Sequence, residues 1–179
     1  PPTPDDSSAA SDVYKRQGFT VTCCEIELDL ETGKYEILDM VTIAESGTIV
    51  HPQGMENQLV GGAVWGIGLS GYERHLYDPQ NGLPASTGYW QSKVPTYLDT
   101  PVKIGTGWVD LPDPENPVGA RGIGEPSMGA VSAALTAAIT DALDGHHFAT
   151  APITADMIIN HLAGTEENAA PLAQNNFRG

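Results

Sequence analysis

The sequence contains few basic residues and no long hydrophobic run. Of its 179 residues, 8 are Lys or Arg and 23 are Asp or Glu, which gives a formal net charge of −15. This imbalance argues against binding to nucleic acid or to an anionic membrane, because both require a face rich in Lys and Arg. No run of about 18 apolar residues occurs, so no membrane span is expected.

Cysteine is also scarce. The sequence has 2 cysteines, Cys23 and Cys24, and they are adjacent. Neighbouring side chains on a strand point to opposite faces, so we expect no disulfide between them, and the pair says little about the redox compartment. The first residues lack the charged and apolar regions of a secretory signal. We therefore expect a cytoplasmic location, with the periplasm as the alternative if the chain is exported with a partner subunit.

A hydrophobic content of 40% is enough for a buried core, and the length suggests one compact domain or a piece of a larger one. Residues 1–17 are rich in Pro, Ser and Asp, and their end (SDVYKRQ) resembles a translated cloning scar. We interpret 1–17 as a disordered or foreign leader, 18–164 as the folded portion, and 165–179 as a flexible tail.

The folded portion predicts an α+β class, with strands first and helices mostly later. Apolar and acidic residues alternate from Cys24 to Leu30, which is typical of a strand with one solvent-exposed face. Residues 31–34 favour a tight turn with Gly33 in the left-handed conformation, and 35–44 predict the returning strand. Short strands are expected around the turn at 77–82, and another near 102–111.

A glycine-rich helix is expected over 55–69, because Met55, Leu59, Ala63 and Ile67 recur every four residues. Each of its glycines costs about 1 kcal/mol relative to alanine, so we expect this helix to approach another group closely. Residues 66–71 also match the GxGxxG pattern. They lie within a predicted helix instead of following a strand, so we interpret the match as accidental.

Two helices are expected near the C-terminus. The first begins at Ser127 and ends at Gly145, and the second runs from Thr154, which is expected as its N-cap, to Leu162. Three histidines lie near the ends of these helices, at positions 146, 147 and 161. They lack cysteine or carboxylate neighbours at ligand spacing, so we interpret them as loop histidines, not as a metal site.

The segment 119–127 (GARGIGEPS) brackets one carboxylate, that of Glu125, where an irregular loop meets the start of a helix. Pro126 suits a first helical turn, and the helix dipole favours a negative charge there. A carboxylate held ionised on a rigid loop suits a general base. A plain N-terminal cap explains the same residues equally well.

Six segments in a fixed order resemble the C-terminal end of the molybdenum-carrying large subunit of the xanthine dehydrogenase/aldehyde oxidase family of molybdenum hydroxylases. They are EIELDLETGKYEILDMVTIAESG, HPQGMENQLVGGAVWGIG, KVPTYLDTP, NPVGARGIGEPS, SAALTAAITDAL and APITADMII. The likeness covers roughly residues 18–164. The family usually has Asn-Pro where this chain has His51-Pro52.

The resemblance implies roles for individual residues. Glu125 falls on the glutamate that deprotonates the Mo–OH group in this family, before attack on a carbon next to nitrogen or on an aldehyde carbonyl. Gln58 falls on the glutamine that hydrogen-bonds the pterin cofactor. Gly61 and Gly62 match the glycine pair that follows this glutamine, and Gly124 is expected to contact the cofactor as well.

The resemblance also implies cofactors and partners. The cofactor is molybdopterin in the cytosine dinucleotide form, and the substrate is a small molecule. The [2Fe-2S] and FAD centres are expected on partner subunits or domains, since this chain has no cluster-binding cysteine set. The family's molybdenum subunits are several times longer, so we expect a fragment whose pocket is completed by an upstream part, and which is inactive alone. The alternative is a non-catalytic acidic α+β module in which Glu125 is only a cap.

Overall fold

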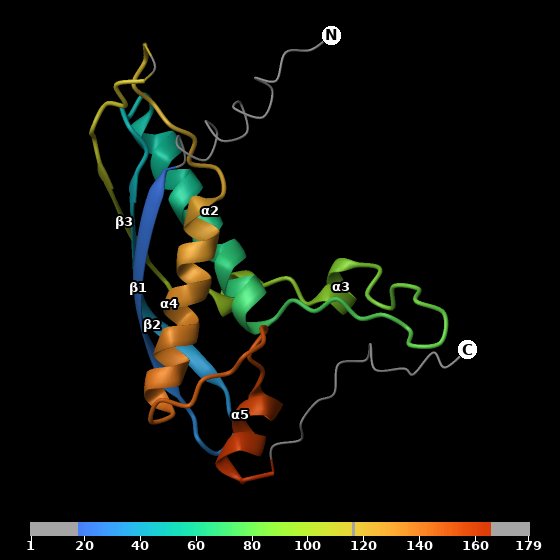
Figure 1. Ribbon diagram of the computed structural model, residues 1–179. Coiled ribbons are helices and arrows are strands. Elements are labelled where there is room, and N and C mark those ends of the chain that lie inside the picture. The colour runs from blue at the N-terminus through green and yellow to red at the C-terminus, as the bar shows by residue number, and fades with distance from the viewer. Residues whose placement is uncertain (1–17, 116, 166–179) are drawn as a thin grey trace.

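Three strands and two long helices form a two-layer structure (Figure 1). The computed structural model describes residues 18–115 and 117–165, so the predicted leader and nearly all of the predicted tail lie outside the described residues. Helices α2 and α4 cover one face of the sheet, α2 over β2 and β3 and α4 over β1. The α+β class is confirmed. The elements are β1 (Phe19–Leu28), β2 (Tyr35–Glu45), α2 (Pro52–Gly71), α3 (Tyr89–Ser92), the 3-10 helix η1 (Tyr97–Asp99), β3 (Ile104–Val109), α4 (Pro126–Ala142) and α5 (Ala155–Leu162).

The predicted hairpin is confirmed, with a shifted first strand. β1 begins at Phe19 and ends at Leu28, so the prediction of a strand to Leu30 was wrong, and Leu30 is exposed. The chain turns early because the Asp29 carboxylate accepts hydrogen bonds from the backbone N–H of Glu31, at 2.8 Å, and from the Thr32 hydroxyl, at 2.7 Å. Gly33 has φ +68°, the left-handed conformation that the turn requires.

Acidic side chains face one another on the outer face of this hairpin. The antiparallel register places Glu25 opposite Asp39 and Glu27 opposite Glu36, and all four residues are exposed. Like charges directly opposite each other on neighbouring strands are destabilising. The hairpin is held by its other face, where apolar residues of both strands pack against the helices.

The core lies between the sheet and the two long helices. The predicted apolar face of the glycine-rich helix is confirmed, since Met55, Leu59, Ala63 and Ile67 are all buried. The larger of two buried clusters joins β2, α2, α4 and α5; its members are Ile37, Met40, Ala63, Ile67, Val131, Leu135, Ile139, Leu143, Ile153 and Ile158. The smaller one holds Ala44, Met55 and Leu59, with Ile49 and Ile123 packed against it.

Glycine allows α2 and α4 to approach each other closely. A Cβ added at Gly62 would overlap the Ser127 hydroxyl, and one at Gly66 would lie 2.6 Å from the Met128 carbonyl oxygen. Gly61 differs, because no described atom lies within 4 Å of the place where its Cβ would be. The close approach that the sequence predicted is therefore made, at Gly62 and Gly66, to α4.

β3 pairs with β2 in parallel, so the connection between them crosses over the sheet through α2. After α2, residues 72–103 leave the body as an arm that returns to β3 (Figure 1). The β-like pieces expected around the turn at 77–82 are present only as a short pairing, and no full strand of the described residues lies there. The segments on either side of this turn pair only briefly, through one isolated antiparallel bridge between Tyr77 and Pro84 and backbone bonds from Asp78 to Leu83 and from Ala85 to Leu76. No helix in the described ranges is long and apolar enough to cross a membrane.

Candidate functional site

Glu125 occupies the N-cap position of α4, directly before Pro126, as the sequence predicted. Its side chain makes no capping hydrogen bond to any described residue, and the residue is exposed. A cap residue stabilises a helix by accepting a hydrogen bond from a backbone N–H of the first turn. The plain-cap interpretation therefore lacks the contact on which it depends, and the carboxylate oxygens remain available to an external group.

Gln58 lies on α2 close to the loop that carries Glu125. The Gln58 Oε1 atom is 4.0 Å from the position that a Cβ on Gly124 would take, and Gln58 is exposed. The Ser127 hydroxyl donates a hydrogen bond of 3.4 Å to the Gln58 backbone carbonyl, which ties the start of α4 to α2. The fold thus brings Gln58, Gly124 and Glu125 together from two distant parts of the chain.

The glycines around these side chains leave the backbone accessible. Gly61, Gly122 and Gly124 are exposed, and the space around Gly61 and Gly122 holds no described atom within 4 Å of an added Cβ. Gly62 faces away from this surface, buried against Ser127. An exposed amide, an exposed carboxylate and bare backbone form a surface that suits a polar, hydrogen-bonding group lying close to the chain.

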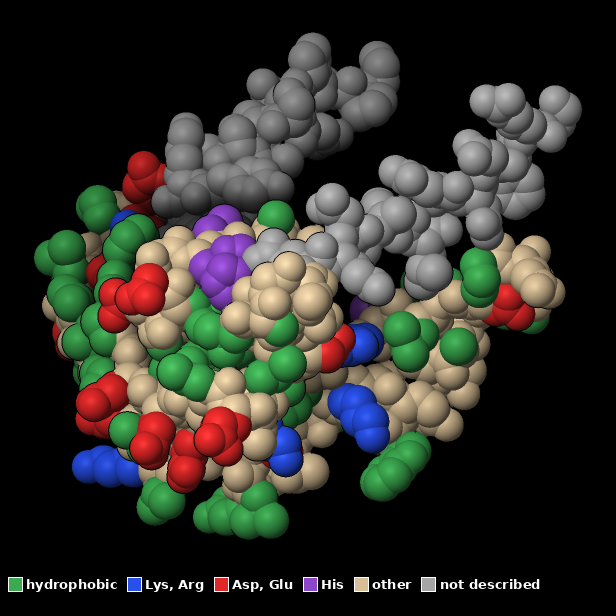
Figure 2. All heavy atoms as spheres, turned by 90° about the horizontal axis from the view of Figure 1, so that it is seen from below, with side chains coloured by type: hydrophobic (Ala, Val, Ile, Leu, Met, Phe, Trp, Pro, Cys, Tyr) green, Lys and Arg blue, Asp and Glu red, His purple; other side chains and the backbone are tan. Residues whose placement is uncertain are grey.

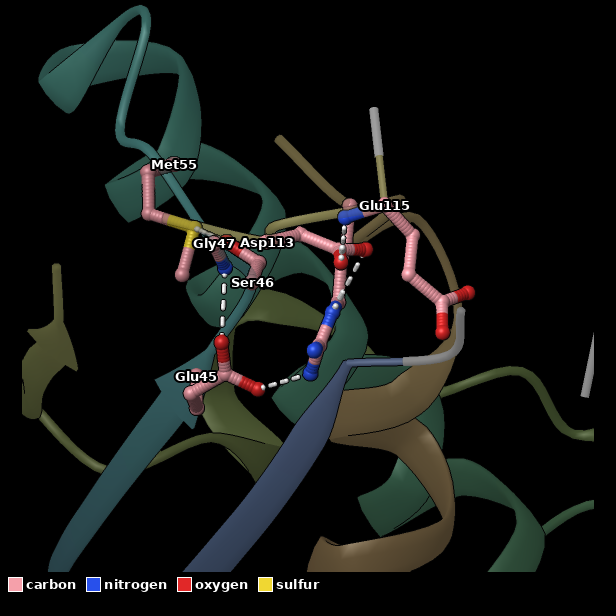
Figure 3. A network of polar contacts seen from close by, with 7 residues as sticks. Glu45, Ser46, Gly47, Met55, Asp113 and Glu115 are labelled. Carbon is pink, nitrogen blue, oxygen red and sulfur yellow. Dashed lines mark hydrogen bonds and ion pairs between the residues drawn. The ribbon is translucent and has the colours of Figure 1, made fainter. Parts of the chain in front are cut away.

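The loop before Glu125 is held by a network of charged side chains (Figure 3). The Arg121 guanidinium bonds Glu45 Oε2 through Nη1 at 2.6 Å and Asp113 Oδ2 through Nε at 3.2 Å. Asp113 is 3% exposed at its side chain and Glu45 is 19% exposed. The hydrogen bond to Asp113, with the negative charge of Glu45, raises the pKa of Arg121 above its usual value, so the guanidinium stays charged.

His51 provides the N-cap of α2, which the sequence analysis missed. Its backbone is extended, as expected before Pro52, and its Nδ1 accepts a 2.7 Å hydrogen bond from the Gly54 N–H. Asparagine is among the preferred N-cap residues and uses its side-chain oxygen in the same way. His51 therefore makes the cap contact that Asn provides at such a position. A polar side chain before a Pro at the first helical position was the available signal.

Two cavities flank the helices, and neither is lined by Gln58 or Glu125. One of about 1190 Å³ lies between β2, α2 and the end of the arm, and one of about 630 Å³ lies along the outer side of α4. The Tyr35 hydroxyl is buried beside the first, and burial raises its pKa well above the usual value. Gln58, Gly124 and Glu125 are all exposed, so the surface that they form in the described structure is open.

Two other motifs were singled out in the sequence, the glycine pattern at 66–71 and the histidines at 146, 147 and 161. Residues 66–71 lie inside α2 and not between a strand and a helix, which agrees with an accidental GxGxxG match. His146 stacks on His161 with ring centroids 3.5 Å apart, and Figure 2 shows His side chains gathered in one place. Among the described residues, no group of three His, Cys, Asp or Glu side chains could hold a metal ion.

Comparison with known proteins identifies a family and several relatives. The sequence model of the molybdopterin cofactor-binding domain matches residues 2–101, more than half of the chain. The chain is 35% identical, over 87% of its length, to the gamma subunit of the 6-hydroxypseudooxynicotine dehydrogenase complex of Paenarthrobacter nicotinovorans, and covers 20% of that protein. It is 29% identical to the xanthine dehydrogenase molybdenum-binding subunit of Escherichia coli O157:H7, over 82% of this chain and 19% of the relative.

A solved structure resembles the same region. Quinoline 2-oxidoreductase from Pseudomonas putida 86 matches 77% of this chain and 18% of its own, with a TM-score of 0.72 and 31% identity. The chain thus spans about a fifth of the length of the relatives that it matches.

Proposed function

Because the chain belongs to the molybdopterin cofactor-binding domain family, we propose that it is the C-terminal portion of the catalytic subunit of a molybdenum hydroxylase. The observation that supports this most directly is the open surface on which Gln58, Gly124 and Glu125 lie together. The reaction is oxidative hydroxylation of an N-heterocycle or an aldehyde. The names of relatives support this substrate class, since they include quinoline 2-oxidoreductase and aldehyde oxidoreductase.

Glu125 is the general base in this proposal. Its carboxylate makes no capping bond in the described structure, so an oxygen lone pair can accept a proton from a group on the open surface. The positive end of the α4 dipole favours a negative charge at this position. The loop that carries Glu125 is held to β2 and to the segment after β3. The carboxylate is therefore already in place before the reaction, which avoids the entropic cost of fixing it in the transition state.

Gln58 and the glycines bind the cofactor in this proposal. The Gln58 side chain carries both a donor and an acceptor, which suits the edge of a pterin. Gly61 and Gly124 let such a group reach the backbone, while Gly62 acts indirectly, because it sets the distance between α2 and α4. Two-electron oxidation is the chemistry that the molybdenum-pterin group supplies when bound.

We also propose the finer assignments of cofactor, partners and location. The cofactor is the cytosine dinucleotide form, and electrons leave through [2Fe-2S] and FAD centres on partner subunits. The upstream part of the molybdenum subunit completes the pocket. The names of relatives, a gamma subunit of a complex and a large subunit, support separate partner chains. The location proposed is cytoplasmic. Release of CMP on hydrolysis of the purified cofactor tests the dinucleotide form.

Exposed apolar side chains on the arm agree with a neighbouring part of the protein that covers them. Tyr89, Trp90, Tyr97 and Leu98 are each 82–92% exposed, which is unusual for large apolar residues. The end view in Figure 2 likewise shows hydrophobic side chains exposed among acidic ones. The surface of this chain thus has the character of one that packs against further protein.

The decisive experiment replaces Glu125 with Gln in the molybdenum subunit that contains this chain, assembled with its partners. Gln keeps the shape of the side chain and cannot take up the proton. Turnover should fall by about 10²–10⁴, the contribution of a general base, with molybdenum content unchanged. Glu115→Gln, on the same loop, is the matched control and should be neutral. Normal turnover in Glu125→Gln would refute the catalytic assignment.

A second experiment tests Gln58. Gln58→Ala removes one hydrogen bond to the bound cofactor, which should cost about 1–3 kcal/mol of binding free energy and lower pterin occupancy. Gln53→Ala, an exposed residue five positions earlier on α2, serves as the control. Equal pterin occupancy in both variants would mean that Gln58 is only a surface residue of the helix.

A further inference from the structure

The end of β2 and two positions of the loop between β3 and α4 meet at Arg121. Glu45 ends β2, Asp113 follows β3, and Arg121 lies four residues before Glu125. Figure 3 shows the carboxylates of Glu45 and Asp113 converging on the same guanidinium group. Both carboxylates also fix backbone, because Glu45 Oε1 accepts from the Gly47 N–H at 2.8 Å and Asp113 Oδ1 accepts from the Glu115 N–H at 3.0 Å.

The backbone of the same loop is paired with the segment after β2. The Arg121 N–H donates to the Ser46 carbonyl at 2.6 Å, and the Thr48 N–H donates to the Gly119 carbonyl at 2.7 Å. Between these bonds, Gly47 and Ala120 form an isolated antiparallel bridge. The loop is therefore attached to the end of β2 by main-chain bonds as well as by the guanidinium.

The next residues connect this attachment to the proposed base. Ile123 packs against the buried cluster of Ala44, Met55 and Leu59, so the side chain after Gly122 is also held by the body of the protein. Only Gly124 separates Ile123 from Glu125. Glycine is the most flexible residue, so the direction of the Glu125 backbone depends on how firmly the preceding residues are fixed.

We propose that Arg121 is a positioning residue that holds the 119–125 loop so that the Glu125 carboxylate faces the surface of Gln58. This inference rests on the proposed function of Glu125. Arginine suits the role because its planar guanidinium bonds two carboxylates at once, while lysine offers a single point charge. Without the guanidinium, Glu45 and Asp113 would face each other as like charges, and the loop would move away from β2.

The test uses the assembled holoenzyme that contains this chain, with Arg121→Gln and Arg121→Lys. Displacement of a catalytic group by about 1 Å can cost about 100-fold in rate, so kcat of Arg121→Gln should fall by about 10–100-fold with KM little changed. Arg121→Lys should recover part of this loss. Amide hydrogen exchange, measured by mass spectrometry, should become faster over 119–128 in Arg121→Gln, and molybdenum content should not change.

Arg74→Gln is the matched control. Arg74 forms an ion pair of 3.5 Å with Asp156 in α5, so this variant removes an arginine from an ion pair away from the loop, whereas Arg121→Gln removes one from two. Glu45→Gln serves as a second variant, since it removes one charge from the network and keeps an oxygen for the Gly47 N–H. It should lower kcat by less than Arg121→Gln does, and should also speed exchange over 119–128.

The outcomes separate the inference from the proposed function. If Glu125→Gln loses turnover while Arg121→Gln and Glu45→Gln stay within twofold of Arg74→Gln, the positioning role is wrong and the function stands. If Glu125→Gln retains turnover, the function itself fails. If Arg121→Gln does not fold, the Glu45→Gln variant tests the positioning role in its place. An unchanged kcat in Glu45→Gln would then overturn the inference. Failure of all three network variants to fold overturns it too, because Arg121 would then serve the fold alone.

Discussion

Gly61 and Gly62 are neighbours on α2, yet alanine at these two positions should change the stability of the protein in opposite directions. Gly61 is exposed, with no described atom within 4 Å of a new Cβ. Gly62 is buried, and a new Cβ there would overlap the Ser127 hydroxyl and lie 3.0 Å from the Ser127 Cβ. The two variants make the same chemical change in the same helix and differ only in what the added methyl group meets.

The expected magnitudes follow from these surroundings. Alanine in a helix interior is favoured over glycine by about 0.5–1 kcal/mol, so Gly61→Ala should raise the free energy of unfolding by that amount. Gly62→Ala has the same gain, offset by overpacking that typically costs about 1–3 kcal/mol. The two variants should therefore differ by about 1–3 kcal/mol, or about 2–4 °C in Tm for each kcal/mol in a chain of this size.

Urea denaturation of the 179-residue chain, followed by circular dichroism, measures the two free energies. Ser127→Ala supplies an internal check, because it removes the oxygen that the Gly62→Ala methyl group would overlap. The double variant should be more stable than the sum of the single effects predicts, since the pair is in contact. Recovery should be partial, because the Cβ at position 127 remains close.

Equal stability of Gly61→Ala and Gly62→Ala would refute this reasoning. It would mean that α2 and α4 can separate at no cost, and that the buried position of Gly62 does not set their distance. Strict additivity of Gly62→Ala and Ser127→Ala would refute the assignment of the overlap to the hydroxyl. In the holoenzyme, loss of pterin from Gly61→Ala despite its higher stability would support a cofactor contact at Gly61.

Three further predictions concern the fold. Leu135→Ala should lower the free energy of unfolding by about 2–5 kcal/mol in the same urea assay, because Leu135 is fully buried. Gly33→Ala should cost at least about 1–2 kcal/mol, since φ is +68° and a Cβ would approach the Ala155 carbonyl oxygen; a neutral result would contradict the left-handed turn. Burial raises the pKa of Cys24 to about 11, so iodoacetamide near neutral pH should label Cys23 and spare Cys24. The folded thiol keeps its proton above the pKa of an unfolded cysteine, about 8.5, so its contribution to stability is complete below that pH and is lost as pH rises toward 11.

The parts of the fold that were predicted from sequence depend on local physics. The hairpin followed from alternation and from a glycine at the turn. The glycine-rich helix followed from a four-residue apolar spacing, and the start of the next long helix from Pro126. Leu30 was misassigned because alternation continues past the strand, while the Asp29 turn, formed by side-chain hydrogen bonds, ends it. The turn at 77–82 was placed correctly, but turn-forming residues do not reveal how far the flanking segments stay paired, and here the pairing ends after one bridge.

Long-range relations were not accessible in the same way. The glycines of α2 predicted a close approach, but only the structure identifies α4 as the partner at Gly62. The parallel pairing of β3 with β2 depends on a crossover that no local pattern specifies. For the candidate site, Glu125 was identified from its place between a glycine-rich loop and a helix start, and Gln58 from a resemblance. The ion pairs of Arg121 join the loop between β3 and α4 to the end of β2, and no local pattern in the sequence indicates them.

The facing carboxylates on the outer side of the hairpin should make this part of the protein more stable as ionic strength rises. At 0.15 M salt the Debye length is about 8 Å, while opposite side chains on paired strands are about 5 Å apart. The repulsion between facing carboxylates is therefore only partly screened at this salt concentration. More concentrated salt therefore weakens a repulsion between Glu25 and Asp39 and between Glu27 and Glu36, and no ion pair of the described residues involves these four. A protein held together by surface ion pairs loosens as salt is added. At the hairpin, counterions from the solution screen a repulsion that no basic side chain of the described residues offsets, so lowering the salt concentration should destabilise this part of the protein.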